Sequence, residues 1–451
     1  RGAEVLVGRE GAFQPAVESE GHGLGFPVVR NLVGAHLDPP EGEAARVKRD
    51  HAGVELLRHQ ARQLARRADA AEEGGERALQ AGILVEEHAD EAAALAMRLD
   101  EFNAARKEIE AAVKVFQKTY GDSVAGRKVE VILKDDGGLQ PDMTKRLAQE
   151  LVTKDHVQVL AGFGLTPLAM AAAPVASQAK VPMVVMAAAT SIIPTKSPYI
   201  VRTGFTLPQV TAPLADWVLA HKEQKINRVI TLVTDYGPGI DAEKVFVKRF
   251  SAGGGTIVES LRAPLQNPDF APFLQRIKDA KPDAVFIFVP SGVGTSVMKQ
   301  VAERGLVKAG IRVIATGDLT DDNEMENIGA SAQGVITSFH YSAAHDSPEN
   351  KTYVAEMAKL GLRANFHSVG GYDGMHLIYE ALKKTGGDAD GDKLLAAMKG
   401  ASWTSVRGPV SIDPETRDIV QNVYLRRVEN VKGLWSNVEF DKVEKFKDPG
   451  V

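Results

Sequence analysis

The chain has 451 residues, 44% of them hydrophobic, so it is long enough for two or three domains with large cores. Its net charge of −5 gives no indication of nucleic-acid binding. It has no cysteine, which excludes disulfides, thiolate metal sites and cysteine nucleophiles, and no apolar run approaches the roughly 20 residues of a membrane helix.

Residues 1–105 differ in composition from the rest of the chain. They hold eleven arginines and one lysine, Lys48, and their apolar positions are too few for a packed core. This segment is either a poorly ordered or loosely helical extension, or a stretch foreign to the protein, translated in a wrong frame and joined to the true coding region near Arg106. No secretory signal is visible, so an export signal is absent or missing from this sequence.

The following residues predict alternating helices and strands. The expected order is a helical pattern over Glu91–Tyr120, a strand over Val129–Leu133, a helix over Met143–Thr153, a strand over Val157–Ala161, an alanine-rich helix, a strand over Val181–Met186 and an extended run over Tyr199–Arg202.

A second alternating series begins after a helix over Pro208–His221. Its expected strands are Val229–Val233, Thr256–Ser260, Ala284–Val289, Ile311–Ala315 and Val335–Phe339, and its expected later elements are helices Asn350–Leu360, Tyr372–Lys384 and Gly391–Met398 and a hairpin of Val410–Ile412 with Val423–Arg427. Two such series predict an α/β protein with two doubly wound lobes and a cleft between them. We expect residues 106–203 and 337–405 in lobe one, and residues 204–336 and 406–451 in lobe two.

Motifs of enzymes and cofactor sites are absent from the sequence. Gly162-Phe163-Gly164 follows a strand, but Pro167 stands where a dinucleotide fingerprint has its third glycine. There is no Walker loop and no GxSxG elbow, and the six histidines after residue 106 have no metal-ligand spacing. We therefore expect no catalytic residue, no metal and no cofactor.

Small and hydroxylated residues follow the two central strands, where loops of a parallel sheet form a ligand crevice. At the first strand, Thr166 offers a hydroxyl and a helix N-terminus that attracts a carboxylate, or it serves only to cap the helix. At the second, Ala188, Ala189 and Thr190 offer backbone groups, close approach and a hydroxyl, or they form an ordinary loop.

Two residues of the second series extend this set. Tyr236 follows a strand and is placed to cover a ligand with its ring, or it only covers the strand end. Asp318 ends a later strand and is placed to pair with an ammonium group, or it belongs, with Asp321 and Asp322, to a solvated helix start. Taken as a set at the strand ends of two lobes, these residues predict a site for a zwitterion.

The chain from about Lys107 to Gly450 resembles the solute-binding proteins of branched-chain amino acid ABC transporters, the leucine/isoleucine/valine-binding type with the type I periplasmic-binding fold. The resemblance rests on these segments: KVEVILKDDGG (128–138), KRLAQELV (145–152), VPMVVMAAATS (181–191), VTDYGPGIDA (233–242), NPDFAPFLQRIKDAKPDAVFIFVPSG (267–292), HYSAAHDSPEN (340–350), GGYDGMHLIYEAL (370–382) and RGPVSIDPETRDIVQNVY (407–424).

The resemblance implies how a solute is held. The carboxylate of an amino acid would lie at the tip formed by Leu165 and Thr166 and at Ala188 to Thr190. Its ammonium would meet the Ala188 carbonyl and Asp318, while Tyr236 closes over it from the other lobe.

The family also implies a periplasmic or otherwise extracytoplasmic protein, monomeric and without enzymatic activity. It would trap a small solute by hinge closure and deliver it to an ABC transporter permease in the membrane. Relatives carry aromatic acids, amides and urea as well, so these remain alternative solutes, and a ligand-sensing module on the same fold is an alternative role.

Three departures from the family stand out. Pro167 removes one backbone donor beside Thr166, and the stretch Val289-Pro290-Ser291 lacks a second aromatic residue. Relatives also begin with an apolar strand inside the lobe-one sheet, for which this chain has only Gly82–Val85 nearby. This missing strand favours a frame error before Arg106, and a sheet without an interior strand is expected to fold poorly.

Overall fold

The computed structural model describes residues 105–451 with the exception of residue 267, all within one compact unit of the chain. The expectations for residues 1–104, including the frame error, the Gly82–Val85 run and the first part of the Glu91–Tyr120 helix, lie outside the described residues. Residues 105–120 are helical, as predicted. None of the helices in the described range is long and apolar enough to cross a membrane.

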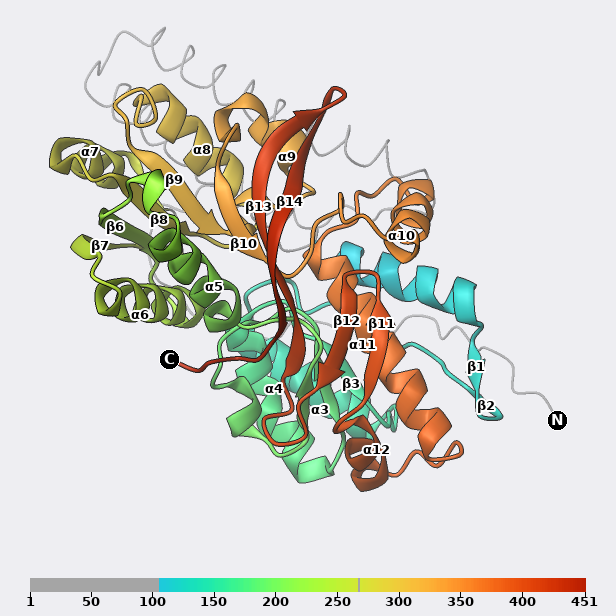
Figure 1. Cartoon of the computed structure of the whole chain (residues 1–451). Coiled ribbons are helices and arrows are strands. Elements are labelled where there is room, and N and C mark those ends of the chain that lie inside the picture. The colour runs from blue at the N-terminus through green and yellow to red at the C-terminus, as the bar shows by residue number, and fades with distance from the viewer. Residues whose placement is uncertain (1–104, 267) are drawn as a thin grey trace, which may run out of the picture. The chain divides into compact units, whose positions relative to one another are not determined.

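Two main sheets organise the described residues (Figure 1). The first has the order β3-β4-β5, all parallel, with strands Leu160–Gly162, Met183–Val185 and Ile200–Arg202. The second has nine strands in the order β11-β12-β13-β10-β9-β8-β6-β7, with β14 paired to β13. Its strands are β6 Arg228–Thr234, β7 Thr256–Ala263, β8 Ala284–Phe288, β9 Arg312–Thr316, β10 Ile336–Phe339, β11 Ser402–Ser405, β12 Gly408–Ile412, β13 Ile419–Val431 and β14 Leu434–Phe446.

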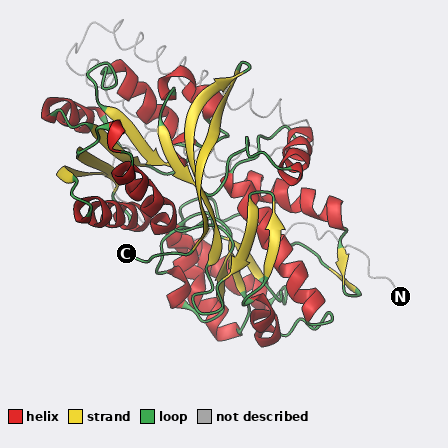
Figure 2. Ribbon diagram, in the orientation of Figure 1, coloured by secondary structure: helices red, strands yellow, loops and turns green. Residues whose placement is uncertain are grey.

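Helices flank the strands of both sheets (Figure 2). They are α3 Pro141–Thr153, α4 Thr166–Ala179, α5 Leu207–Ala220, α6 Gly237–Ala252, α7 Ala271–Ala280, α8 Gly294–Glu303, α9 Met325–Ile328, α10 Pro348–Lys359, α11 Phe366–Lys384 and α12 Gly391–Met398. Short 3₁₀ turns are η1 Ile193–Lys196, η2 Lys222–Gln224, η3 Gly317–Thr320 and η4 Gly329–Ala332, and a two-stranded hairpin pairs β1 Ser123–Val124 with β2 Arg127–Lys128.

The central strands β6 and β8 of the second sheet are apolar on both faces because helices cover both faces. Along β6, Ile230 and Leu232 enter one core cluster together with residues of α7 and α8. Val229 and Val233 point the other way, into a cluster with residues of α5 and α6. A parallel strand buried on two sides reads as a continuous apolar run, which is why its position could be predicted.

The α/β class and the alternating order are confirmed, and most expected elements lie within a few residues of their observed bounds. The type of fold is that of two parallel sheets, each with its own apolar core, extended by antiparallel strands at the carboxyl end of the chain. The exact division of the chain between two lobes stays a prediction.

The expected strand Val129–Leu133 is wrong. This segment is irregular, and the side chains of Val131, Ile132 and Leu133 are 41%, 39% and 45% exposed. A strand forms only when another strand takes its backbone hydrogen bonds. Among the described residues β3 pairs with β4 alone, so nothing completes a ladder beside this apolar run.

The carboxyl-terminal hairpin is longer than the sequence pattern predicts. Val423–Arg427 belongs to the 13-residue strand β13, which pairs with β12, β10 and the 13-residue strand β14. In Figure 1 the pair β13 and β14 runs as one long ribbon. The sequence of β14 alternates charged and apolar residues only weakly, and its partner on β13 stabilises it.

Candidate functional site

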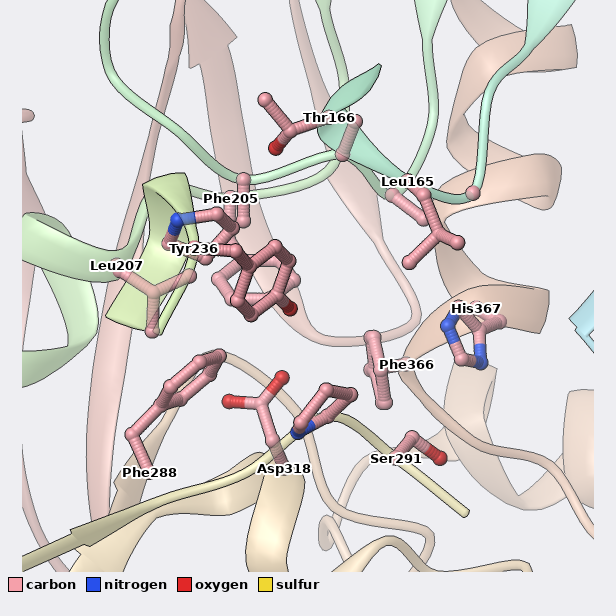
Figure 3. A pocket seen from close by; sticks show the side chains of 16 residues that line it. Leu165, Thr166, Phe205, Leu207, Tyr236, Phe288, Ser291, Asp318, Phe366 and His367 are labelled. Atoms are coloured by element: carbon pink, nitrogen blue, oxygen red, sulfur yellow. The ribbon is translucent and has the colours of Figure 1, made fainter. Parts of the chain in front are cut away.

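A cavity lies at the carboxyl ends of strands from both sheets (Figure 3). Its free volume is about 40 Å³, well below the roughly 300–1,000 Å³ typical of small-molecule sites. A dinucleotide or a peptide does not fit in this volume. Its walls are Gly164, Leu165, Thr166, Ala187, Ala188, Ala189, Phe205, Leu207, Tyr236, Pro238, Phe288, Pro290, Ser291, Asp318, Phe366 and His367.

The cavity brings together residues that the sequence analysis singled out from separate loops. Six of the seven line it: Leu165, Thr166, Ala188, Ala189, Tyr236 and Asp318. The seventh, Thr190, lies directly behind, with its Oγ1 atom 2.9 Å from Oγ1 of Thr166. The contact of each with a solute remains a prediction.

Thr166 does not cap its helix. Leu165 holds the N-cap position of α4 in an extended conformation and makes no side-chain cap, while Thr166 is the first helical residue. The Thr166 hydroxyl is bonded to Thr190 instead of to the helix backbone. Pro167 has no N–H, so the backbone donors at this helix start are fewer than usual.

The backbone of Ala188 is already engaged. Its N–H donates to the Phe163 carbonyl at 2.9 Å, and its carbonyl accepts from Nη1 of Arg202 at 3.0 Å. The Arg202 side chain is fully buried and is paired with Asp418, whose Oδ1 atom lies 2.6 Å from Nε. A guanidinium at this carbonyl opposes the approach of a second cation, such as the ammonium of an amino acid.

Asp318 is buried, so it is not part of a solvated helix start. It lies in η3, its side chain accepts a hydrogen bond from Thr316 Oγ1 at 2.8 Å, and the residue is 5% exposed. Burial raises the pKa of Asp318 from 3.8 to about 6, against the opposing effect of the Thr316 hydrogen bond. Asp321 and Asp322 are each 3% exposed, and burial followed by the nearby Glu108 raises the pKa of Asp321 to about 7.

This elevated pKa predicts a pH dependence of stability. The folded chain keeps a proton on Asp318 over a range, about pH 4 to 6, in which the unfolded chain has released it. The stability contributed by this protonation is complete below the unfolded pKa and is lost as the pH rises through about 6. From pH 4.5 to pH 7.5, the free energy of unfolding measured with urea should decrease less for Asp318→Asn than for the wild type. Equal losses in both proteins would contradict the prediction.

Aromatic side chains form much of the cavity wall, and the sequence analysis found only Tyr236. Phe205, Phe288 and Phe366 also line the cavity, and the Tyr236 and Phe288 rings are stacked with centroids 6.1 Å apart. Phe288 is the last residue of β8, directly before the stretch in which no aromatic residue was expected. The sequence offered a signal for Phe288, because this residue ends a predicted strand. It offered none for Phe366, which belongs to α11, far along the chain.

His367 was also missed. It follows Phe366 in the first turn of α11, where Asn365 caps the helix and bonds reciprocally with Ser368. Its Nδ1 atom lies 3.1 Å from Oε2 of Glu108, a residue of the helical segment 105–120 that is 2% exposed. Nothing in the local sequence of His367 indicates this pairing across 259 positions.

Within the described residues no group of three or more histidine, cysteine, aspartate or glutamate side chains could hold a metal ion. The polar groups of the cavity wall are the Thr166 hydroxyl, backed by that of Thr190, together with a carboxyl, a phenol, a serine and an imidazole.

Comparison with known proteins gives the family. The sequence model of a family described as periplasmic binding protein matches residues 88–433. Leu/Ile/Val-binding protein homolog 6 of Brucella abortus is 47% identical over 350 residues, which cover 76% of this chain and 89% of that protein.

Solved structures agree. A solute-binding protein of an ABC transporter from Rhodopseudomonas palustris, in complex with 3,4-dihydroxybenzoic acid, is 58% identical with a TM-score of 0.75, over 77% of this chain and 95% of that one. A second from the same species, in complex with p-hydroxybenzoic acid, is 44% identical with a TM-score of 0.75 and the same coverage. A leucine-binding protein from Thermotoga maritima, 22% identical with a TM-score of 0.66 over 76% of this chain and 95% of its own, shares the fold.

The family model matches most of this chain, and the matches to the relatives span nearly the whole length of those proteins. The chain therefore belongs to the periplasmic binding proteins, within the solute-binding proteins of ABC transporters that have the type I fold.

Proposed function

We propose that the chain captures a small aromatic carboxylic acid of the hydroxybenzoate class and passes it, chemically unchanged, to an ABC transporter permease. The observation that carries the proposal is the cavity wall of four aromatic rings, Phe205, Tyr236, Phe288 and Phe366. Rings of this kind favour a flat aromatic solute, because offset and edge-to-face pairs contribute about 0.5–1.5 kcal/mol each beyond the area that they bury.

The polar groups suit the same solute. The N–H groups of Ala189 and Thr190 have no partner among the described residues and remain available as donors to a carboxylate. On the other side of the cavity, the Asp318 carboxyl and the Tyr236 hydroxyl can exchange hydrogen bonds with a phenolic hydroxyl. Two relatives at 58% and 44% identity hold hydroxylated benzoic acids.

A branched-chain amino acid is the second candidate, which Asp318 favours. A buried carboxylate is the usual partner of a ligand ammonium, and curated relatives carry the name Leu/Ile/Val-binding protein homolog. One observation weighs against it: the carbonyl of Ala188 already faces the Arg202 guanidinium.

We further propose that the protein works outside the cytoplasmic membrane as a monomer, closes around the solute by a hinge movement and carries out no reaction. These proposals follow from the family, whose members deliver solutes to membrane permeases. Sensing of the same solute is the alternative role.

Isothermal titration calorimetry with a defined panel tests the proposal. The panel is 4-hydroxybenzoate, 3,4-dihydroxybenzoate, benzoate, urea, leucine, isoleucine and valine. We expect one site for a hydroxybenzoate with an affinity at least about 100-fold higher than for any aliphatic amino acid, a difference of about 2.7 kcal/mol. Tight binding of leucine without measurable binding of any benzoate would overturn it in favour of the second candidate.

A further inference from the structure

The cavity wall has a single candidate for a positive charge. Its lining holds no lysine and no arginine, and His367 is the only lining residue that can become a cation. The carboxyl of Asp318 lies in the same wall, and Asp321 accepts a hydrogen bond from the lining residue Ser291. An anionic solute entering this site meets negative groups, so it needs a compensating cation.

Glu108 holds the His367 ring in a defined orientation. Its two carboxylate oxygens accept hydrogen bonds from Nδ2 of Asn323 at 2.7 Å and from Nδ2 of Asn365 at 2.8 Å, and one of them faces Nδ1 of His367 at 3.1 Å. With a hydrogen on Nδ1, the ring donates to this carboxylate oxygen. The second nitrogen of the ring, Nε2, is left to face another partner.

The Nε2 side of the ring is turned toward the cavity. Figure 3 shows His367 at the cavity edge beside Phe366, with one ring nitrogen directed inward. Nε2 has no hydrogen-bond partner among the described residues, and although the side chain is only 11% exposed, this atom is not sealed from solvent. A ring nitrogen that is open to the cavity can bond a ligand group.

The surroundings of His367 favour its charged form. Burial lowers its pKa, but Glu108, by hydrogen bond and charge, and the charges of Asp321 and Asp318 raise it, with a net increase above 6.5. The neighbouring His340 is buried, and burial together with Arg407 and Arg426 keeps its pKa well below the usual value, so it adds no positive charge. With Nδ1–H directed at Glu108, the imidazolium presents Nε2–H to the cavity.

We infer that His367 is the charged partner of the solute carboxylate, in addition to the N–H groups of Ala189 and Thr190: its imidazolium donates from Nε2 to the bound acid, and Glu108 is the positioning residue that fixes the ring. This inference rests on the proposed binding of an aromatic acid and adds the residue that selects acids over neutral analogues. Through Glu108, His367 is also linked to Asn323 and Asn365. Residues of α11, of the segment 105–120 and of the loop after β9 therefore all support the group that binds the carboxylate.

Calorimetric titrations of three ligands test it: 4-hydroxybenzoate, benzoate and the neutral 4-hydroxybenzamide. In His367→Gln the affinity for both acids should fall at least about ten-fold, since a hydrogen bond between charged groups is lost, while the affinity for the amide changes less than about three-fold. His376→Gln is the matched control, because His376 also lies in α11 but outside the cavity, and it should bind all three ligands like the wild type.

Two further measurements separate charge from structure. In an Asp318→Asn/Asp321→Asn background, which removes the two nearby carboxyls whose pKa is raised, the affinity for benzoate should decrease as the pH rises through the pKa of His367. Adding Glu108→Gln should move this decrease to lower pH, because the raising effect of Glu108 is gone. The ¹⁵N shifts of His367 in histidine-labelled protein should show imidazolium in the benzoate complex at pH 7.

The outcomes are distinguishable. If the wild type binds no aromatic acid, the proposed function fails and the inference fails with it. If the wild type binds acids but His367→Gln keeps both their affinity and the preference over the amide, only the inference is overturned. A loss confined to 4-hydroxybenzoate, with benzoate unaffected, would assign Nε2 to the phenolic hydroxyl and would also overturn it. Thermal unfolding of each variant verifies that it is folded before titration.

Discussion

Replacing Asp373 with asparagine is expected to lower the free energy of unfolding by about 3–5 kcal/mol, although the two side chains have nearly the same size. Asp373 lies in α11 and pairs with Arg407, with 2.8 Å between Oδ2 and Nη2 and both side chains 0% exposed. The substitution leaves the Arg407 guanidinium buried without a counter-charge, and this uncompensated cation is the cause of the loss.

The network around this pair explains why the charge cannot be relieved locally. Asp373 also accepts hydrogen bonds from Nε1 of Trp403 at 2.9 Å and from Oγ of Ser405 at 2.8 Å. Arg407 donates to the carbonyls of Thr203 and Gly204, next to the segment that leads into the cavity. An asparagine can replace at most part of these contacts, and its amide hydrogens would oppose the arginine.

Urea unfolding followed by far-ultraviolet circular dichroism measures the effect as a lower midpoint at an unchanged slope. The control is Asp388→Asn, which removes an exposed ion pair with Lys393 and should leave the midpoint unchanged within error, because water already solvates both charges. A change below about 1 kcal/mol for Asp373→Asn would show that the pair is dispensable and would contradict the prediction.

The second large effect concerns solute affinity and Tyr236. Tyr236→Ala is expected to weaken the binding of 4-hydroxybenzoate by about 10- to 100-fold, because a central aromatic side chain in a desolvated pocket contributes about 1.4–2.7 kcal/mol. Tyr236 occupies the N-cap position of α6 with an extended backbone, and its ring stacks against Phe288. In Figure 3 the ring projects into the cavity between Thr166 and Asp318.

Two variants make the interpretation specific. Tyr236→Phe keeps the ring and removes the hydroxyl, so it should retain most of the affinity for benzoate and lose more for 4-hydroxybenzoate, whose hydroxyl needs a partner. Tyr120→Ala is the remote control, since Tyr120 is 51% exposed and outside the cavity wall, and its titration should match that of the wild type. Wild-type affinity in Tyr236→Ala would mean that the aromatic wall does not hold the solute.

Much of the cavity wall could be predicted because parallel strands end at the same edge of a sheet. The strands before Thr166, Ala188, Tyr236 and Asp318 are short apolar runs bounded by small or charged residues, and such runs are readable in the sequence. Once two strands are parallel neighbours, the loops that follow them converge whatever their sequence. The cavity contains all four residues for this reason.

Other expectations failed where a partner elsewhere in the chain decides the structure. Val129–Leu133 has the composition of a strand, yet it is irregular and exposed because no described segment pairs with it. The strand β14 has little strand pattern of its own, yet it extends over 13 residues because β13 lies beside it. Strand propensity measures only how well a segment suits a sheet, and the segment forms a strand only where a neighbouring strand is present.

By itself, the sequence determined the α/β class, the order of helices and strands and the strand ends at which Thr166, Tyr236 and Asp318 lie, because these follow from local apolar periodicity and from short connections between neighbouring elements. Only the tertiary structure decided that Phe366 and His367 enter the same cavity, that Glu108 orients the imidazole and that Arg202 occupies the Ala188 carbonyl. These contacts join residues far apart in the chain, and their strength comes from shared burial, which no local pattern encodes.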